Sequence, residues 1–230
     1  GQESPKWVGR CPSCGEWNTF KEFTVRKENA SVAVAGSFRQ ALTGEQQHPR
    51  PVPVGQIVSE KEPRLNMYDD ELNRVLGGGL VAGSLVLLGG EPGIGKSTLI
   101  LQTVLKLTDK RVLYVSGEES ARQLKLRADR LVPEAERTKE SKDGFLARSL
   151  CMVVCETSLE RIFLHIRNEQ PQLVVIDSIQ TIMTEAVDSS PGSISQVREC
   201  ASLLLKFAKE SNIPVILIGH INKEGSLAGP

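Results

Sequence analysis

A glycine-rich loop that ends in a lysine and a hydroxyl carries the clearest chemistry in this sequence. Residues 90–97 read Gly-Glu-Pro-Gly-Ile-Gly-Lys-Ser, which satisfies the pattern G-x-x-x-x-G-K-[ST]. A strand-like run precedes the loop and a helix-like run follows it, which disfavours the alternative of a glycine-rich turn with an incidental lysine. The glycines let backbone N–H groups surround phosphates, where side chains would collide. Lys96 would reach the β and γ phosphates and Ser97 would bind Mg²⁺, so the loop predicts a nucleoside triphosphate site.

The second half of such a site is a carboxylate at the end of a buried strand. Residues 173–177 read Leu-Val-Val-Ile-Asp, and Asp177 would hold the water shell of the Mg²⁺. The alternative is that Asp177 caps a helix. Its position downstream of the loop, in an alternating α/β pattern, favours the metal role. The residues that we expect to contact ATP and Mg²⁺ are Gly90, Glu91, Pro92, Gly93, Ile94, Gly95, Lys96, Ser97, Thr98 and Asp177.

Two adjacent carboxylates, Glu118 and Glu119, follow another strand-like run at residues 111–116. A carboxylate at this point could polarise the water that attacks the γ-phosphate. Successive residues point in different directions, so only one of the two can face the phosphate. We favour Glu118 as the catalytic residue and Glu119 as a cap of the following helix, while the alternative that both are solvated caps stays open.

His220 comes at the carboxyl end of the last strand-like run, residues 214–219. Ligands of open α/β folds bind at this edge of the sheet, so we expect His220 to sense the γ-phosphate; the alternative is a purely structural histidine. Segments 181–192 and 222–230 leave the same edge, and their composition suggests that both move with the nucleotide state. Lys223 is the candidate DNA contact, because the first segment contains no Lys or Arg.

Apolar strands alternate with amphipathic helices through the core of the sequence, which predicts a mostly parallel sheet covered on both faces. Strands are expected near 84–89, 111–116, 151–155, 172–177 and 214–219, and helices near 96–107, 119–130, 158–169 and 195–210. A short helix is expected over 69–76. The charged stretch 134–149 lacks periodicity, and we interpret it as a surface insertion.

Composition excludes few classes of function. Lys plus Arg equals Asp plus Glu at 28 each, so any nucleic-acid binding must come from local patches. No apolar run approaches the ~20 residues of a membrane span. The first residues do not resemble a secretory signal either. We therefore expect a protein of the cytoplasm or of an organelle interior, without a membrane partner.

The five cysteines form two groups. Cys11 and Cys14 have the C-x-x-C spacing of a zinc knuckle, but a structural zinc needs four ligands, so they are half a site. Cys151, Cys155 and Cys200 lie in apolar surroundings along the chain, and we expect them to be buried as small hydrophobes.

With these residues identified, the chain resembles the RadA/Sms family of bacterial and plant-organelle DNA repair and recombination ATPases. Four segments carry the resemblance: residues 6–19 around the C-x-x-C pair, 71–80 (ELNRVLGGGL), 114–120 (YVSGEES) and 220–230 (HINKEGSLAGP). A phosphate-binding loop alone is shared by many families, whereas this series is much more specific.

The resemblance implies a RecA-like P-loop fold in which the His220 strand lies between the loop strand and the Asp177 strand. It also implies that Glu118 is the catalytic glutamate of a DNA-dependent ATPase. The family forms homohexameric rings that bind single-stranded DNA in the central channel. These rings use ATP to drive branch migration of recombination intermediates, with a recombinase filament as partner. Segments 181–195 and 222–230 match the two channel loops.

The resemblance also implies that two family elements lie outside this sequence: the first C-x-x-C pair and a domain resembling the Lon protease. We therefore expect a fragment in which residues 1–24 are a partial zinc-ribbon-like module, 25–62 a linker or strap, and 63–230 the RecA-like core. Zn²⁺ is expected in the complete protein, and weakly or not at all in the fragment.

Two other classes of function share part of this pattern. A RecA-like nucleotide switch or autokinase of the clock-protein type has the same glycine-rich approach and P-loop, but the zinc module disfavours it. A small-molecule phosphotransferase would need an arginine-rich lid, which the sequence does not suggest.

Overall fold

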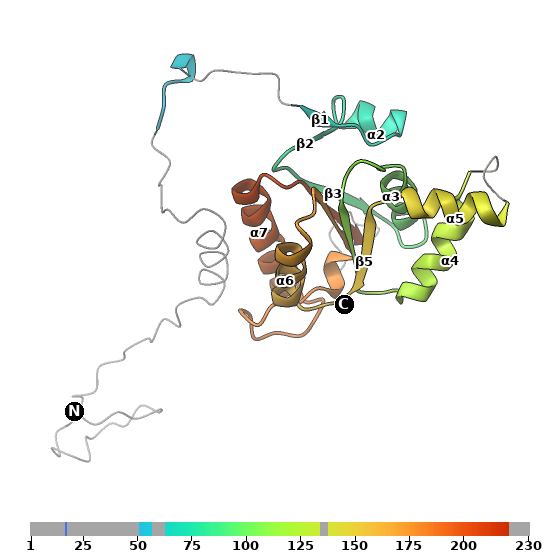
Figure 1. Cartoon of the computed structure of the whole chain (residues 1–230). Coiled ribbons are helices and arrows are strands. Elements are labelled where there is room, and N and C mark those ends of the chain that lie inside the picture. Colours follow the sequence, from blue (N-terminus) through green and yellow to red (C-terminus); the bar gives the residue numbers. More distant parts are fainter. Residues whose placement is uncertain (1–16, 18–50, 57–62, 134–137, 221–230) are drawn as a thin grey trace.

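The computed structural model describes residues 17, 51–56, 63–133 and 138–220. Figure 1 shows a central sheet with α6 (Leu159–Glu169) and α7 (Ile194–Ser211) on one side and α3 (Lys96–Leu105), α4 (Ala121–Leu131) and α5 (Lys139–Arg148) on the other. The α/β class with helices on both faces is therefore confirmed. Even α7, the 18-residue helix, lacks the apolar length of a bilayer span, and so do the other helices of the described ranges.

The central sheet is parallel and has the strand order β3-β7-β6-β4-β5. Its strands are β3 (Leu85–Gly90), β4 (Val112–Ser116), β5 (Cys151–Cys155), β6 (Leu173–Asp177) and β7 (Val215–His220). Each lies within a residue of its expected position. The RecA-like order is confirmed, since β7 lies between the strand of the glycine-rich loop and the strand of Asp177.

Burial along the strands explains why the carboxyl edge carries the chemistry. The three central strands β4, β6 and β7 are almost entirely buried, as their Val, Ile and Leu runs predict for strands covered on both faces. The register pairs Gly90 with His220 and Ser116 with Asp177. The last residues of four neighbouring strands therefore meet at one edge of the sheet.

Two apolar layers hold the helices against the sheet. One layer joins α6 and α7 to alternate residues of the strands, and includes Phe163 and Phe207, whose ring centroids are 5.6 Å apart. The other joins α3 and α4 to the opposite residues of the strands. Serine caps begin α4, α6 and α7; at α4, Ser120 and Gln123 form a reciprocal capping box.

Short elements precede the core. The helix η1 (Val54–Gln56) comes first, and β1 (Arg64–Leu65) then pairs antiparallel with β2 (Leu80–Val81). Between these strands lies α2 (Asp70–Val75), which the Asp69 side chain caps. The helix expected over 69–76 is therefore confirmed.

The surface insertion expected at 134–149 contains a helix, α5, in place of irregular chain. Its Phe145 and Leu146 pack against the apolar layer of α3 and α4. Only a short apolar patch of α5 makes this contact. Such a patch is too short to produce a detectable helical period in the hydrophobicity of the sequence.

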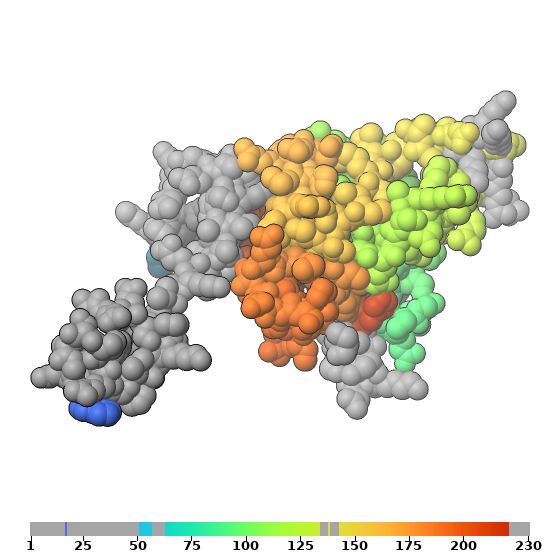
Figure 2. Space-filling model, turned by 90° about the horizontal axis from the view of Figure 1, so that it is seen from below, coloured from blue at the N-terminus to red at the C-terminus, as the bar shows by residue number. Residues whose placement is uncertain are grey.

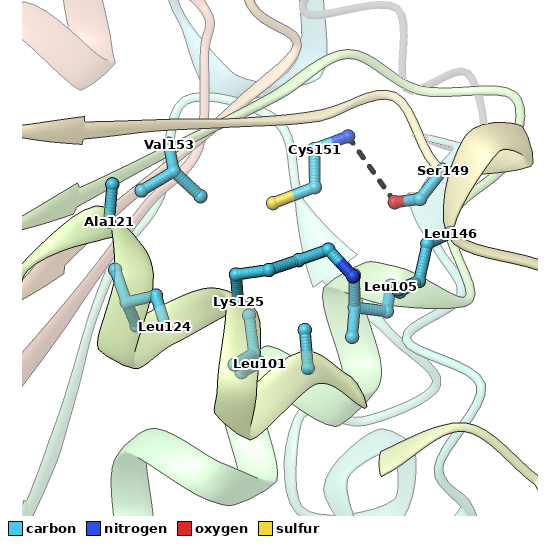
Figure 3. A pocket seen from close by; sticks show the side chains of 10 residues that line it. Leu101, Leu105, Ala121, Leu124, Lys125, Leu146, Ser149, Cys151 and Val153 are labelled. Carbon is cyan, nitrogen blue, oxygen red and sulfur yellow. Dashed lines mark hydrogen bonds between the residues drawn. The ribbon is translucent and has the colours of Figure 1, made fainter. Parts of the chain in front are cut away.

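Of the three cysteines expected to be buried, only Cys200 is. Cys155 is exposed and Cys151 is half-buried, so that expectation was wrong for the strand β5. β5 lies at the edge of the sheet, and α4 covers its face only in part. Figure 3 shows Cys151 and Val153 on a pocket of about 330 Å³ between β5, α3 and α4. Burial raises the pKa of the Cys151 thiol to about 12, so it is not a reactive thiolate.

Candidate nucleotide site

The glycine-rich loop joins the end of β3 to the start of α3, as a P-loop requires. Gly93 and Gly95 have φ of +82° and +98°, in the left-handed region that side chains rarely adopt. A Cβ at either position would meet no atom within 4 Å. The glycines are therefore required by the path of the backbone, and open space remains beside the loop for a ligand.

Lys96 is buried, and its ammonium lies beside the first residues of the loop. Nζ donates to the carbonyls of Gly90 and Glu91, both at 2.8 Å, and lies 3.3 Å from Nδ1 of His220. An ammonium can only donate, so Nδ1 of His220 is the acceptor in this contact and the ring hydrogen is on Nε2. The lysine thus already lies beside the end of β7.

Ser97 and Asp177 meet at the start of α3, although 80 residues separate them in the sequence. The Ser97 hydroxyl donates to Oδ1 of Asp177 at 3.0 Å, and Asp177 is 5% exposed. A hydroxyl and a carboxylate are the hard oxygen ligands that Mg²⁺ takes beside a nucleotide, so the residues present fit that ion.

Tyr114 is a residue of this site that the sequence reasoning missed. Its hydroxyl donates to Oδ2 of Asp177 at 2.5 Å, and its side chain is fully buried. Burial, and then the charge of Asp177, raise the pKa of Tyr114 far above its ordinary value, so the hydroxyl stays protonated and donates. A tyrosine within an otherwise apolar strand end was the signal that could have revealed it.

The two glutamates after β4 point in different directions. Oε1 of Glu118 accepts from the Ser178 hydroxyl at 2.5 Å and lies 3.2 Å from Nε2 of His220. Glu119 instead forms an ion pair with Arg127 of α4. The expectation that Glu119 caps α4 was wrong, because the capping residue is Ser120.

A close packing contact holds Glu118 at the site. The N–H of Gly117 donates to the carbonyl of Asp177 at 2.8 Å, which joins the turn after β4 to the end of β6. A Cβ on Gly117 would lie 1.9 Å from Oγ1 of Thr181, in the short helix η3 (Ile179–Thr181). Only glycine allows this approach, which brings Glu118 beside Ser178.

With the geometry described, comparison with known proteins decides the family. Residues 49–226 match the family model described as AAA domain, which covers most of the chain and every residue of the nucleotide site. The chain belongs to the AAA domain family. Residues 1–22 separately match the model described as Rubredoxin metal binding domain.

Relatives of this AAA-domain chain include proteins described as DNA repair protein RadA, which confirms the resemblance noted from the sequence. The protein from Bacillus subtilis (strain 168) is 48% identical over 232 residues, and that from Pseudomonas aeruginosa is 45% identical over 231 residues. Each alignment covers 100% of this chain but 47% of the relative. The chain thus spans about half the length of the curated relatives it matches.

A solved structure of a DnaB-like replicative helicase shares the fold of this AAA domain. The TM-score is 0.59, the sequence identity is 18%, and the match covers 71% of this chain and 44% of the helicase chain. At this identity the likeness concerns the fold alone, and it supports the RecA-like class.

The segment 181–192, whose composition suggested mobility, is bound to the flanking helices α6 and α7 through residues 184–189. Gln196 of α7 is 1% exposed; its Oε1 accepts from the Thr184 N–H, and its Nε2 donates to the carbonyls of Thr184, Val187 and Ser189. Glu160 of α6 accepts from the Thr184 hydroxyl at 2.6 Å. Composition did not predict these partners, because they come from helices on either side of the segment.

The residue before this segment, Gln180 of η3, contacts the end of β7. The Gln180 side chain donates to the carbonyl of His220 at 2.9 Å. In Figure 2 the orange surface that follows β6 lies close to the red patch at the end of β7. Three residues expected to take part in function, Lys223, Cys11 and Cys14, lie outside the described residues.

Proposed function

We propose that this chain is the ATPase part of a DNA repair protein of the RadA type, and that it hydrolyses ATP at the edge of the sheet described above. The observation that carries the proposal is the 3.0 Å contact between the Ser97 hydroxyl and Asp177 at the start of the loop's helix. A hydroxyl and a carboxylate are the protein groups that hold magnesium in P-loop ATPases. Here the fold brings them together from the start of α3 and the end of β6.

Each polar residue has a separate role in this proposal. Lys96 binds the β and γ phosphates, and Ser97 and Asp177 hold Mg²⁺ with its water. When bound, the ion neutralises the charge that develops on the phosphates. Glu118 orients the attacking water, and the His220 imidazole reports whether the γ-phosphate is present.

The contacts of Lys96 suggest how the nucleotide is sensed. Its ammonium donates hydrogen bonds to two carbonyls and to Nδ1 of His220. A γ-phosphate would compete for the same hydrogens, which would release Nδ1 of His220. The other ring nitrogen lies beside Glu118, so a change at the lysine reaches the catalytic glutamate through a single imidazole.

The proposal also includes DNA. We expect single-stranded DNA and branched recombination intermediates as substrates, branch migration as the output, a homohexamer as the assembly and a recombinase filament as partner. Support comes from the relatives described as DNA repair protein RadA. Lys223 is the proposed DNA contact, and Cys11 and Cys14 are proposed zinc ligands, supported by the metal-binding model matched at residues 1–22.

An ATPase assay on the full chain tests the proposal. We expect release of labelled phosphate from γ-labelled ATP, and a faster rate with single-stranded DNA. Lys96→Ala should abolish release, whereas Lys110→Ala, which removes a surface lysine paired with Asp109, should not. Label retained on the protein would favour the autokinase alternative. Unchanged release in Lys96→Ala would reject the site.

A further inference from the structure

Tyr114 lies on the same face of the sheet as Asp177, one of the two proposed magnesium ligands. In the register of β4 and β6 it pairs with Val175, two residues before Asp177. Alternate residues of a strand share a face, so Val175 and Asp177 both face α3, the helix that begins at the glycine-rich loop. The tyrosine ring therefore lies along this face beneath Asp177.

Asp177 is held from two sides by two hydroxyls. Ser97 donates to Oδ1 at 3.0 Å and Tyr114 donates to Oδ2 at 2.5 Å. The two hydroxyl groups differ in how closely their side chains are packed. Ser97 belongs to the first turn of α3 beside the loop, whereas the Tyr114 side chain is fully buried within the apolar layer. The rigid partner thus sets the orientation of the carboxylate before any metal is bound.

We propose that Tyr114 is a positioning residue for magnesium. Its hydroxyl donates a hydrogen bond to Oδ2 of Asp177, so that Oδ1, beside the Ser97 hydroxyl, would be left for the metal and its water. The inference rests on the proposed function, since it assigns Tyr114 to the same metal. Hydrogen-bond partners of metal-ligating carboxylates typically change metal affinity by about 10–100-fold when removed.

Tyr114→Phe tests the inference, because it removes only the hydroxyl. Binding of a fluorescent ATP analogue to the full chain is measured with EDTA and over a series of MgCl₂ concentrations. We expect the affinity in EDTA to stay within about twofold of the unmodified chain, and the MgCl₂ concentration for half-maximal enhancement to rise about tenfold. Excess MgCl₂ should restore binding.

Thr103→Val is the matched control. Thr103 is 1% exposed on α3, and its hydroxyl donates to the carbonyl of Leu99 at 2.7 Å. The control therefore also removes a buried hydroxyl, from the helix that carries the loop, but one that does not touch Asp177. It should leave the magnesium dependence unchanged.

The outcomes separate the two proposals. If the unmodified chain shows magnesium-dependent binding and Tyr114→Phe shows the same dependence, the positioning role is overturned and the proposed function stands. An equal shift in Tyr114→Phe and Thr103→Val would also overturn the role, since it would reflect general loosening. If the unmodified chain shows no magnesium-dependent binding, both proposals fail.

A second measurement is available if Tyr114→Phe does not fold. The sequence holds two tyrosines, so Tyr68→Phe leaves Tyr114 as the sole tyrosine for a ¹³C label at Cζ. We expect its NMR resonance to move when MgCl₂ is added to the nucleotide-bound chain, because the metal draws charge from the carboxylate that the phenol contacts. A resonance that does not move would overturn the inference.

Discussion

Nε2 of His220 lies 3.2 Å from Oε1 of Glu118, although 102 residues separate them in the chain. The contact joins the end of β7 to the turn after β4, across the strand β6 between them. Because the other ring nitrogen contacts Lys96, His220 links the residue proposed to bind phosphate with the residue proposed to orient water.

Replacing His220 should separate binding from hydrolysis. His220→Ala keeps the loop and the metal ligands, so we expect nucleotide affinity within a few-fold of the unmodified chain and turnover lower by about 10²-fold. His220→Gln, whose amide can both donate and accept, should recover part of the turnover. The measurement compares nucleotide affinity with kcat, and equal turnover in all three proteins would contradict the linking role.

The two glutamates can be distinguished by amide replacements. Glu118→Gln keeps the shape but removes the charge, so we expect hydrolysis to fall by about 10²–10⁴-fold while ATP binding persists. Glu119→Gln is the matched control: it weakens the pair with Arg127 and should lower thermal stability with little change in turnover. Steady-state kinetics and melting curves check both, and the reverse pattern would transfer the catalytic role to Glu119.

Gln196 should stabilise the segment that follows β6. Gln196→Ala leaves the Thr184 N–H and three carbonyls without their buried partner, so we expect a loss of about 2–4 kcal/mol in the free energy of unfolding. Urea denaturation gives the loss, and hydrogen exchange should show reduced protection at Thr184. Gln102→Ala, at an exposed position of α3, should change neither. Equal protection in both variants would show that the segment is held by other contacts.

Glu160 should make stability depend on pH in the acid range. Burial raises the pKa of Glu160, but bonds from Thr184, Ser158 and the Glu185 N–H outweigh burial and leave the pKa below its ordinary value of 4.5. As the pH falls below 4.5, the Glu160 carboxylate takes up a proton in the unfolded chain before it does so in the folded chain. The stability that Glu160 contributes is therefore fully present above pH 4.5 and is lost as the pH falls through the pKa of the folded chain.

Glu160→Gln tests this dependence, because the amide does not titrate. The free energy of unfolding is measured by urea denaturation from neutral pH down into the acid range. We expect the unmodified chain to be the more stable at neutral pH, and the difference between the two proteins to shrink as the pH falls below 4.5. A difference that is constant with pH would contradict the prediction.

Much of the fold followed from local pattern. The strand positions followed from short runs of Val, Ile and Leu, and the helix positions from amphipathic periods. The helix α5 and the exposed Cys155 did not, because each depends on how completely one element covers another. Coverage is a property of the assembled layers, and it leaves no period in a single segment.

The sequence alone determined the glycine-rich loop, the alternation of strands and helices, and the residues at the strand ends, because backbone freedom and apolar period are local properties. Only the tertiary structure decided that Tyr114 contacts Asp177, that Glu118 and not Glu119 lies beside His220, and that Gln196 holds the segment after β6. These contacts join distant parts of the chain through strand register and tight packing, and hydrogen-bond partners at such separations are set by the folded geometry.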